Sequence, residues 1–248
     1  KGAITLAISP ALKKLGVKNR SRLFQIPSHI EYITVKPHMK RYMQASAQIY
    51  GTLLNYISPE DIHVYSIDEY FIDITPYTNL YKKTPRQLAQ LLLDAVLDAT
   101  HIYATVGIGT NLFLAKIALD ILAKHAPDFI GYLDENLFKE QIWHHQPITD
   151  IWQIGSGIAN RLRKFGAFDL HGITQVPEHK LYKEFGVNAE LLIDHAWGRE
   201  SCTIADIHAY RPSKHSLSQS QILLRNYTAD EARLPMREMV ESLVLELL

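Results

Sequence analysis

The sequence contains a single cysteine, Cys202, among 248 residues. One thiol cannot build an internal disulfide framework, and such scarcity is typical of proteins from a reducing compartment. Long apolar runs are also missing, since no segment approaches the ~18 uninterrupted apolar residues that a membrane helix needs. The first residues lack the basic start and apolar stretch of a signal peptide. These absences predict a cytoplasmic protein with no membrane partner.

Net charge is absent as well, because 26 basic residues balance 26 acidic ones. Domains that bind nucleic acid are usually basic, so the total alone argues against that role. The distribution carries more information: residues 1–30 contain six lysines and arginines and no acid, and the first carboxylate is Glu31. This basic stretch is either one solvated face of a small lobe or a surface that lies over phosphates.

Apolar periodicity and capping residues predict an α/β arrangement in the first half of the chain. The clearest helix start is Thr84-Pro85-Arg86-Gln87, which combines a capping threonine, a proline at the first helical position and a glutamine placed for a capping box. The alternation of elements suggests one α/β sheet domain. Strands are predicted over residues 3–8, 63–74, 102–108 and 129–133, and helices over residues 11–15, 37–56, 84–101 and 110–124, the last capped by Thr110.

The pattern changes after about residue 134 to short helices separated by glycine and proline, up to about Gly198. Residues 199–214 are expected to be a linker. Beyond it, residues 216–224 are predicted as a strand and residues 229–248 as an amphipathic helix. One strand and one helix cannot bury a core of their own, so this last unit is expected to be incomplete.

Two adjacent carboxylates, Asp68 and Glu69, lie between two β-prone apolar runs in the segment Tyr-Ser-Ile-Asp-Glu-Tyr-Phe-Ile-Asp. Consecutive residues of a straight strand face opposite sides, but at the tip of a tight hairpin both side chains can converge. A hard divalent cation that prefers oxygen ligands, such as Mg²⁺, would relieve their repulsion there. A solvated turn with two acids is the alternative for the Asp-Glu pair taken alone.

The full string resembles the Ser-Ile-Asp-Glu-x-Phe/Tyr-x-Asp signature of Y-family DNA polymerases, the group that contains the DinB and UmuC types. In that family the Asp-Glu pair holds the catalytic metals, which implies catalytic and metal-binding roles for Asp68 and Glu69. The implied chemistry is phosphoryl transfer with two Mg²⁺ ions. One ion lowers the pKa of the primer 3′-hydroxyl, and the other holds the triphosphate and stabilises the leaving pyrophosphate. Asp73 matches the last acid of the signature and is expected to be structural.

Residues 6–17 resemble the finger segment of the same family, where a tyrosine and an arginine contact the incoming triphosphate. Lys13 falls at the arginine position and keeps the charge without the bidentate fork, which implies a nucleotide contact. Pro10 falls at the tyrosine position. Ser-Pro at this point is common in the impB/mucB/samB-type branch, which the chain resembles most.

Residues 105–120 are similar to the family's strand-to-helix element Val-Gly-Ile-(Ser/Gly)-x-Asn-x-x-x-Ala-Lys-x-Ala. A family lysine one turn further on reaches the triphosphate, and Lys124 is its best match, although this chain has one extra residue before it. Lys116 belongs to the signature and is expected to be structural. For both lysines, a solvated position on a helix is the alternative.

Residues 151–162 have the shape of a helix-hairpin-helix, whose glycines permit a tight turn with free backbone N–H groups at a helix N-terminus. Gly155, Ser156, Gly157 and Arg161 are therefore predicted to bind the DNA backbone without sequence preference. The family carries such a motif in its thumb.

Residues 216–224 and the later Glu-Met-Val-Glu segment resemble the start of the family's little-finger domain.

The resemblance implies an α+β fold. It consists of a polymerase palm with a mixed β-sheet and helices, a small fingers lobe, an all-helical thumb with the helix-hairpin-helix, and the truncated start of an α/β little-finger domain. The expected bounds are 1–34 for the fingers, 35–134 for the palm, 135–205 for the thumb, and 206–248 for the linker and little finger.

Several other residues are predicted to carry no chemistry. His144-His145 is the only adjacent histidine pair, and no cysteine or spaced histidine completes a zinc pattern, so no metal role is predicted for it. The three tryptophans are expected to lie in the core rather than to stack on bases, and Cys202 is expected to be inert. The tryptophans are Trp143, Trp152 and Trp197.

The predicted function is template-directed transfer of nucleotides from dNTPs to a primer 3′-hydroxyl, in translesion synthesis during DNA repair and the SOS response. The implied partners are primer-template DNA and dNTPs. In relatives, segments that bind a sliding clamp lie further C-terminal, beyond Leu248. Two alternatives remain: a catalytically dead relative that binds primer-template or a polymerase partner, and another palm-fold nucleotidyl enzyme such as a cyclase, which would not need the helix-hairpin-helix.

Members of the family supply a further metal-binding aspartate and an aromatic steric gate from a first strand near the N-terminus. Both would precede Lys1, so the 248 residues alone are expected to be inactive or nearly so.

Overall fold

The computed structural model describes residues 3–213, 216–223 and 225–247. It divides the chain into two compact units, one made of Lys1–Met39 with Arg211–Leu248 and the other of Lys40–Tyr210. The finer division into fingers, palm, thumb and little finger stays a prediction.

The first unit has a small core of its own, formed by Ile8, Val17, Ile26 and Ile30. Its helix α1 (Pro10–Lys14) begins where the Ser9 side chain accepts a hydrogen bond from the Leu12 N–H and proline occupies the first helical position, which it tolerates well. A short 3₁₀ turn, η1, covers Leu23–Gln25.

The strand predicted over residues 3–8 is wrong. Only an isolated bridge joins Ile4 to Arg22, flanked by hydrogen bonds from Thr5 N–H to Ser21 O and from Leu23 N–H to Ala3 O. A strand is stable when a neighbour satisfies its backbone groups along its length, and this pairing stops after one bridge.

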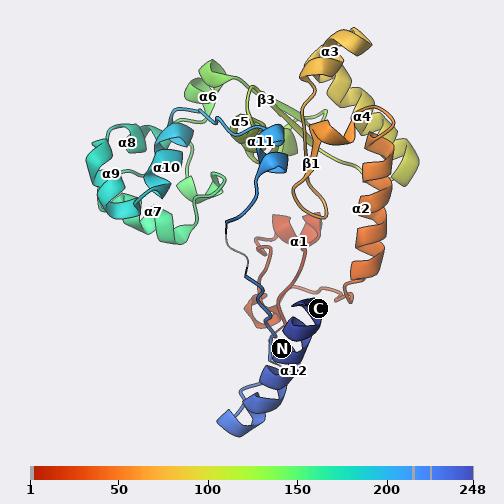
Figure 1. Ribbon diagram of the computed structural model, residues 1–248, viewed down its shortest axis with the longest axis vertical. Helices are drawn as coiled ribbons and strands as arrows, with labels where there is room; N and C mark the ends of the chain where they lie inside the picture. Colours follow the sequence, from red (N-terminus) through yellow and green to blue (C-terminus); the bar gives the residue numbers. More distant parts are fainter. Residues whose placement is uncertain (1–2, 214–215, 224, 248) are drawn as a thin grey trace. The chain divides into compact units, whose positions relative to one another are not determined.

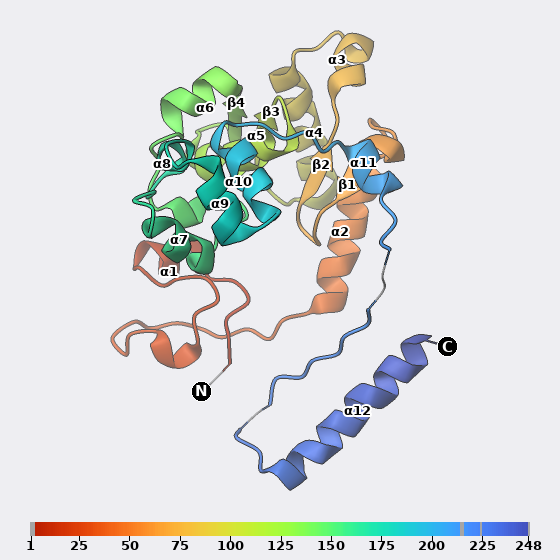
Figure 2. The same cartoon turned by 60° about the vertical axis from the view of Figure 1, so that its left-hand side comes forward.

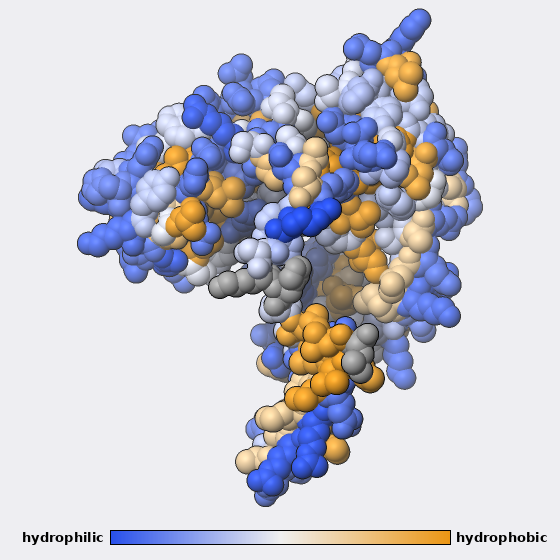
Figure 3. All heavy atoms as spheres, viewed as in Figure 1, coloured by the Kyte–Doolittle hydropathy of each residue, from blue (hydrophilic) through white to orange (hydrophobic). Residues whose placement is uncertain are grey.

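The strand predicted over residues 216–224 is also wrong where the structure describes it, because residues 216–223 pair with no strand, while Leu224 lies outside the described residues. The helix that follows, α12 (Ala229–Leu247), buries only Pro235 among its described side chains. Figure 3 shows apolar atoms along α12 beside hydrophilic ones. Its exposed apolar residues include Leu234, Met236, Val240, Val244, Leu245 and Leu247.

In the second unit, three helices pack around an antiparallel hairpin (Figure 1). The hairpin strands β1 and β2 pair with Ile62 opposite Ile72 and Val64 opposite Tyr70. The start predicted for α4 is confirmed, since Thr84 and Gln87 form a capping box. The elements are α2 (Met39–Leu53), η2 (Pro59–Asp61), β1 (Ile62–Val64), β2 (Tyr70–Ile72), α3 (Thr75–Tyr81) and α4 (Pro85–Thr100).

A second, parallel pair of strands joins β3 (Val106–Gly109) to β4 (Ile130–Leu133). The alternation predicted for this region is visible in β3: Val106 and Ile108 pack with the core side of α4, while Gly107 and Gly109 lie against α5 (Leu112–Ile117). A Cβ at either glycine would overlap the backbone of Ala115, so only glycine lets α5 lie this close to the strand.

The helix predicted from Thr110 to Lys124 is interrupted. Asn111 rather than Thr110 caps it, accepting a hydrogen bond from the Leu114 N–H at 2.8 Å. After α5, a π-helical turn, η3, covers Ala118–Leu122, and a 3₁₀ turn, η4, covers Ala123–His125. A π turn takes up one more residue per hydrogen-bonded ring than an α-helix, and the alignment of Lys124 with the family lysine stays a prediction.

A cluster of short helices, separated by glycine and proline as predicted, shares one core with α5. That core runs from Phe113 in α5 to Ala196 in the last of these helices. Figure 1 shows α7 to α10 gathered together. The elements are α6 (Glu135–Gln141), η5 (Ile148–Asp150), α7 (Ser156–Arg163), α8 (Leu170–Thr174), α9 (Glu178–Phe185) and α10 (Asn188–Ala196).

The linker predicted over residues 199–214 is wrong in its middle, because Ile204–Ala209 form helix α11. Thr203 and Asp206 form a capping box at its start. The helix packs on β1 and η2, and both views show it beside the hairpin (Figure 2). The Thr-x-x-Asp spacing is the signal that indicates this helix.

The α+β class predicted from the sequence is confirmed, with the described strands arranged as one antiparallel and one parallel pair. Within the described residues, no helix is both long enough and apolar enough to cross a bilayer.

Candidate metal and nucleotide site

Asp68 and Glu69 lie at the end of a tight chain reversal, as predicted. The backbone N–H groups of Tyr65 and Ser66 both donate to the Glu69 carbonyl, at 3.0 and 3.1 Å, and close the turn between β1 and β2. Asp68 is exposed, and its Oδ1 accepts a hydrogen bond from Ser66 Oγ at 2.8 Å. The hydrogen bond fixes the orientation of the carboxylate and does not involve the second oxygen, Oδ2.

Glu69 is held by a buried cation. Lys116 Nζ lies 2.7 Å from Glu69 Oε1 and 3.1 Å from Asp120 Oδ2, although only 7% of Lys116 is exposed. Burial lowers the pKa of Lys116, but the hydrogen bond to Glu69 and the charge of Asp120 outweigh it, so the pKa is raised overall. Lys116 therefore stays charged and is structural, as predicted, in a position that also orients Glu69.

The ion pairs continue to the predicted nucleotide-binding lysine. Lys124 Nζ lies 2.8 Å from Asp120 Oδ1, while the other oxygen of Asp120 contacts Lys116. Glu69, Lys116, Asp120 and Lys124 thus form one chain of alternating charges, in which Lys124 is the exposed end. Asp120 was not predicted as a site residue, yet its place four residues from each lysine is the signal that could have found it.

Aromatic side chains flank the hairpin. Tyr65 packs edge-on against Phe71 with ring centroids 5.5 Å apart, and its hydroxyl accepts a hydrogen bond from Trp152 Nε1 at 3.1 Å. Lys116 Nζ lies 5.8 Å from the centre of the Tyr65 ring. Trp143 and Trp152 pack against the core, as predicted. This packing fixes the base of the turn that carries the two carboxylates.

Asp73 makes a contact that agrees with the structural role predicted for it, and that role stays a prediction. Its Oδ1 accepts a hydrogen bond from the Thr75 N–H at 2.9 Å, at the start of α3.

Cys202 is exposed as a residue, but its thiol is partly desolvated. This desolvation, followed by the charges of Glu200 and Asp206, raises the pKa of the thiol. A raised pKa lowers the fraction of reactive thiolate, in keeping with the expectation that this cysteine is inert.

The predicted DNA-binding turn lies at the N-terminus of α7. Gly155 is the capping residue, no side chain caps the helix, and Gly155, Ser156 and Gly157 are all exposed. The left-handed residue of the turn is Gln153, at φ 68°, rather than a glycine. The first N–H groups of α7 therefore have no side-chain acceptor, which is what a phosphate-binding helix end requires.

Arg161 faces α9. Its Nε donates to Glu184 Oε1 at 2.8 Å, and its guanidinium lies 4.2 Å from the centre of the Phe185 ring. The hydrogen bond from Arg161, with a second from Lys164, lowers the pKa of Glu184. Arg161 thus ties α7 to α9, and its contact with DNA stays a prediction.

Lys13 is exposed in the last turn of α1, in the first compact unit. The hairpin carboxylates belong to the second unit. The nucleotide contact of Lys13 stays a prediction.

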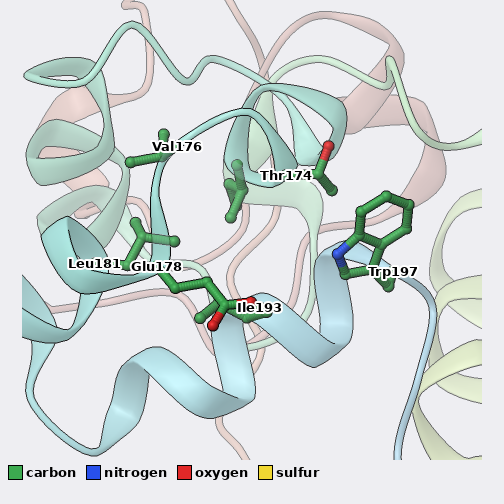
Figure 4. A pocket seen from close by; sticks show the side chains of 7 residues that line it. Thr174, Val176, Glu178, Leu181, Ile193 and Trp197 are labelled. Carbon is green, nitrogen blue, oxygen red and sulfur yellow. The ribbon is translucent and has the colours of Figure 1, made fainter.

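The helical cluster contains a partly open pocket of about 30 Å³, which Figure 4 shows at close range. Ile173 and Thr174 of α8, Leu181 of α9 and Ile193 of α10 contribute to its wall. A space of this size holds about one water molecule, which excludes a nucleotide or a base.

Known proteins match the chain in both sequence and structure. Residues 1–120 match the impB/mucB/samB family. UvrX of Bacillus subtilis (strain 168), which carries the name of a UV-damage repair protein, is 32% identical over 93% of this chain and 54% of its own length. DNA polymerase IV 2 of the same organism is 34% identical over 77% of this chain and 46% of its own length.

A solved structure named as the insertion ternary complex of Dbh DNA polymerase aligns with a TM-score of 0.62 and 28% identity, over 77% of this chain and 55% of that chain. These matches in sequence and structure show that the chain is similar to Y-family DNA polymerases. Within that group, residues 1–120 match the impB/mucB/samB type that the sequence signature predicted. It spans about half the length of the curated relatives it matches.

Proposed function

We propose that the protein containing this chain is a DNA-directed DNA polymerase that extends a primer from dNTPs past damaged template bases, in DNA repair and the SOS response. The observation that carries the proposal is the carboxylate pair at the hairpin tip, in which Asp68 is exposed and the half-buried Glu69 is held by the buried Lys116. Relatives named as DNA polymerase IV, and a solved ternary complex of a similar polymerase, support it and do not favour a catalytically dead protein.

The donor groups at the hairpin fit Mg²⁺. Mg²⁺ is usually held by one or two carboxylates together with substrate phosphates and waters, and Asp68 and Glu69 supply two carboxylates at a solvent-open turn. Asp68 and Glu69 would hold two ions jointly with the triphosphate. When bound, Mg²⁺ supplies the positive charge that lowers the pKa of the primer hydroxyl and stabilises the leaving pyrophosphate.

The chain's own residues orient these ligands. Ser66 fixes Asp68 through one of its oxygens, and Lys116 fixes Glu69 from the buried side. Lys116 is therefore a positioning residue. Preorganised ligands of this kind cost no rearrangement when the reaction occurs.

Lys124 is the candidate for contact with the triphosphate from the second unit. Its side chain is 52% exposed and forms an exposed ion pair with Asp120, which a phosphate oxygen could replace as the partner of Lys124. Lys13 is proposed for the same role from the first unit. The uncapped N–H groups of Gly155, Ser156 and Gly157 are proposed to bind the duplex backbone, with an affinity that falls as salt rises.

The test is primer extension with Mg²⁺ and dNTPs, on undamaged and abasic templates, by the full gene product and its Asp68→Ala variant. Binding of primer-template is measured on the same samples by fluorescence anisotropy. Extension by the parent protein alone, with equal DNA binding by both, is the expected result. Equal DNA binding without extension by either protein would instead identify a non-catalytic relative.

A further inference from the structure

Three metal-binding side chains meet far from the hairpin motif in sequence. His144 follows α6, Asp169 precedes α8, and His171 lies in the first turn of α8. One ligand atom from each residue lies within 4.8 Å of the other two. His144 Nδ1 is 3.0 Å from Asp169 Oδ2, and the two imidazole rings are 4.8 Å apart between centroids. These three residues are called the histidine cluster below.

The backbone holds the two segments of the cluster together. The His171 N–H donates to the carbonyl of Trp143, the residue before His144, at 3.0 Å. The indole of Trp143 packs edge-on against the His171 ring, with centroids 4.9 Å apart, and its Nε1 donates to Ala196 O at 2.7 Å. The two imidazoles are therefore anchored to a fixed framework rather than carried by free loops.

Asp169 is oriented by a second contact. As the capping residue of α8, it accepts a hydrogen bond from the Gly172 N–H on Oδ1, at 2.6 Å, and its side chain is only 16% exposed. The use of Oδ1 in the cap leaves Oδ2 on the side of His144. One carboxylate oxygen thus serves the helix and the other serves the cluster.

Two imidazoles and one carboxylate are a donor set that suits Zn²⁺, whereas Mg²⁺ and Ca²⁺ prefer oxygen alone. Bonds of about 2.0–2.1 Å in a tetrahedral site place neighbouring donors roughly 3.4 Å apart. The His144–Asp169 pair is already that close, at 3.0 Å. The His144 side chain is 68% exposed and has room to rotate onto an ion, while Asp169 is held by its cap on α8.

We propose that His144, Asp169 and His171 bind one Zn²⁺ ion, with water at the fourth position, and that the ion fastens the end of α6 to the start of α8. This proposal is independent of the polymerase activity, because none of the three residues belongs to the hairpin site. His145 supplies a contrast within the same dipeptide, since its Nε2 contacts Asp150 at 3.1 Å, outside the cluster.

The test is calorimetric titration of the tag-free protein with Zn²⁺, repeated with Co²⁺ as a spectroscopic probe of a four-coordinate site. The matched variants are His144→Ala and His145→Ala, which change adjacent histidines. One equivalent should bind to the parent and to His145→Ala with the same affinity. Loss of one ligand in His144→Ala should weaken binding on the order of 100-fold, at least as much as loss of a supporting residue around a metal.

Asp169→Asn is the second variant, because asparagine still caps a helix but has no carboxylate for the metal. It should keep the circular dichroism spectrum and lose Zn²⁺ affinity, and Zn²⁺ should raise the melting temperature of the parent but not of this variant. The proposal is overturned if the parent binds no Zn²⁺, or if His144→Ala and Asp169→Asn bind it as tightly as His145→Ala does.

Discussion

The hairpin site and the histidine cluster both gather metal-binding side chains, but they do so over very different distances in sequence. Asp68 and Glu69 are adjacent, so a single tight turn brings them to one place. His144 and His171 are joined only when α6 and α8 pack, and a backbone hydrogen bond then fixes them. A site whose residues are brought together by one local turn can be predicted from the sequence, whereas a site whose residues meet only through helix packing cannot.

The two sites also differ in how their ligands are held. Glu69 depends on a buried charge, Lys116, which is itself shared with Asp120. The histidine cluster depends on hydrogen bonds with the backbone, namely the cap that Asp169 forms on α8 and the bond from the His171 N–H to Trp143 O. Loss of the single charge of Lys116 should therefore disturb the hairpin site, and stability measurements can test this dependence.

The largest stability effect is expected for Lys116→Met. Removing the buried cation leaves Glu69 and Asp120 without their common partner, and breaking a buried pair costs about 3–5 kcal/mol. Because both carboxylates are partly exposed, we expect the unfolding free energy to fall by less than that, by about 2–3 kcal/mol. Urea unfolding measures it.

Lys124→Met is the matched control, because it removes the other partner of Asp120 from an exposed position. An exposed ion pair contributes about 0–1 kcal/mol, so this change should be small. Equal losses in the two variants would contradict the proposed difference between them.

A smaller effect is expected for Gly107→Ala. The added Cβ would overlap Ala115 O and Leu119 N, so β3 and the helix that carries Lys116 must separate, at a cost of about 1–3 kcal/mol. Gly51→Ala, in the exposed last turn of α2 with no atom near its Cβ, should instead stabilise the protein by up to roughly 0.5–1 kcal/mol. Thermal melts of the two variants should shift in opposite directions, and a shared direction would count against the close packing of α5.

The smallest effect concerns pH. His195 stacks on Phe113 at 4.0 Å and contacts Glu200 at 2.9 Å, and burial lowers its pKa below 6.5 despite the bond to Glu200. The unfolded chain binds this proton more readily, so the stability from neutral His195 is present above pH 6.5 and is lost as the pH falls below it. The slope should reach at most about 1.4 kcal/mol per pH unit.

Unfolding free energies of the parent and His195→Asn between pH 7.5 and 5.5 measure this contribution. The parent should lose more stability than the variant over that interval. A parent that becomes more stable as the pH falls, relative to the variant, would show that Glu200 dominates and that the assigned sign is wrong.

The sequence predicted the hairpin, the α+β class and the capped start of α4, because each depends on a short string of neighbouring residues. It also singled out Lys124, whose nucleotide contact stays a prediction, but it did not indicate the π turn at Ala118–Leu122 that precedes this lysine.

The remaining features depend on contacts that a sequence does not display. Strands predicted at residues 3–8 and 216–224 have the right composition, but the described chain offers no long partner for them. Helix α11 stands within a predicted linker because its apolar side packs on β1. The absence of a zinc pattern around His144-His145 was judged by spacing alone, and the packing of α8 supplies the candidate partners.

The central claim is that Asp68 is a metal ligand while Asp73, five residues later in the same string, supports the fold. Single-turnover primer extension with Mg²⁺ by Asp68→Asn and Asp73→Asn tests it most directly, since both changes remove one carboxylate charge and keep the shape. Asp68→Asn should slow the reaction on the order of 100-fold or more, because metal binding supplies several kcal/mol of transition-state stabilisation. Asp73→Asn should stay close to the parent rate, and equal losses, or none, would contradict the assignment.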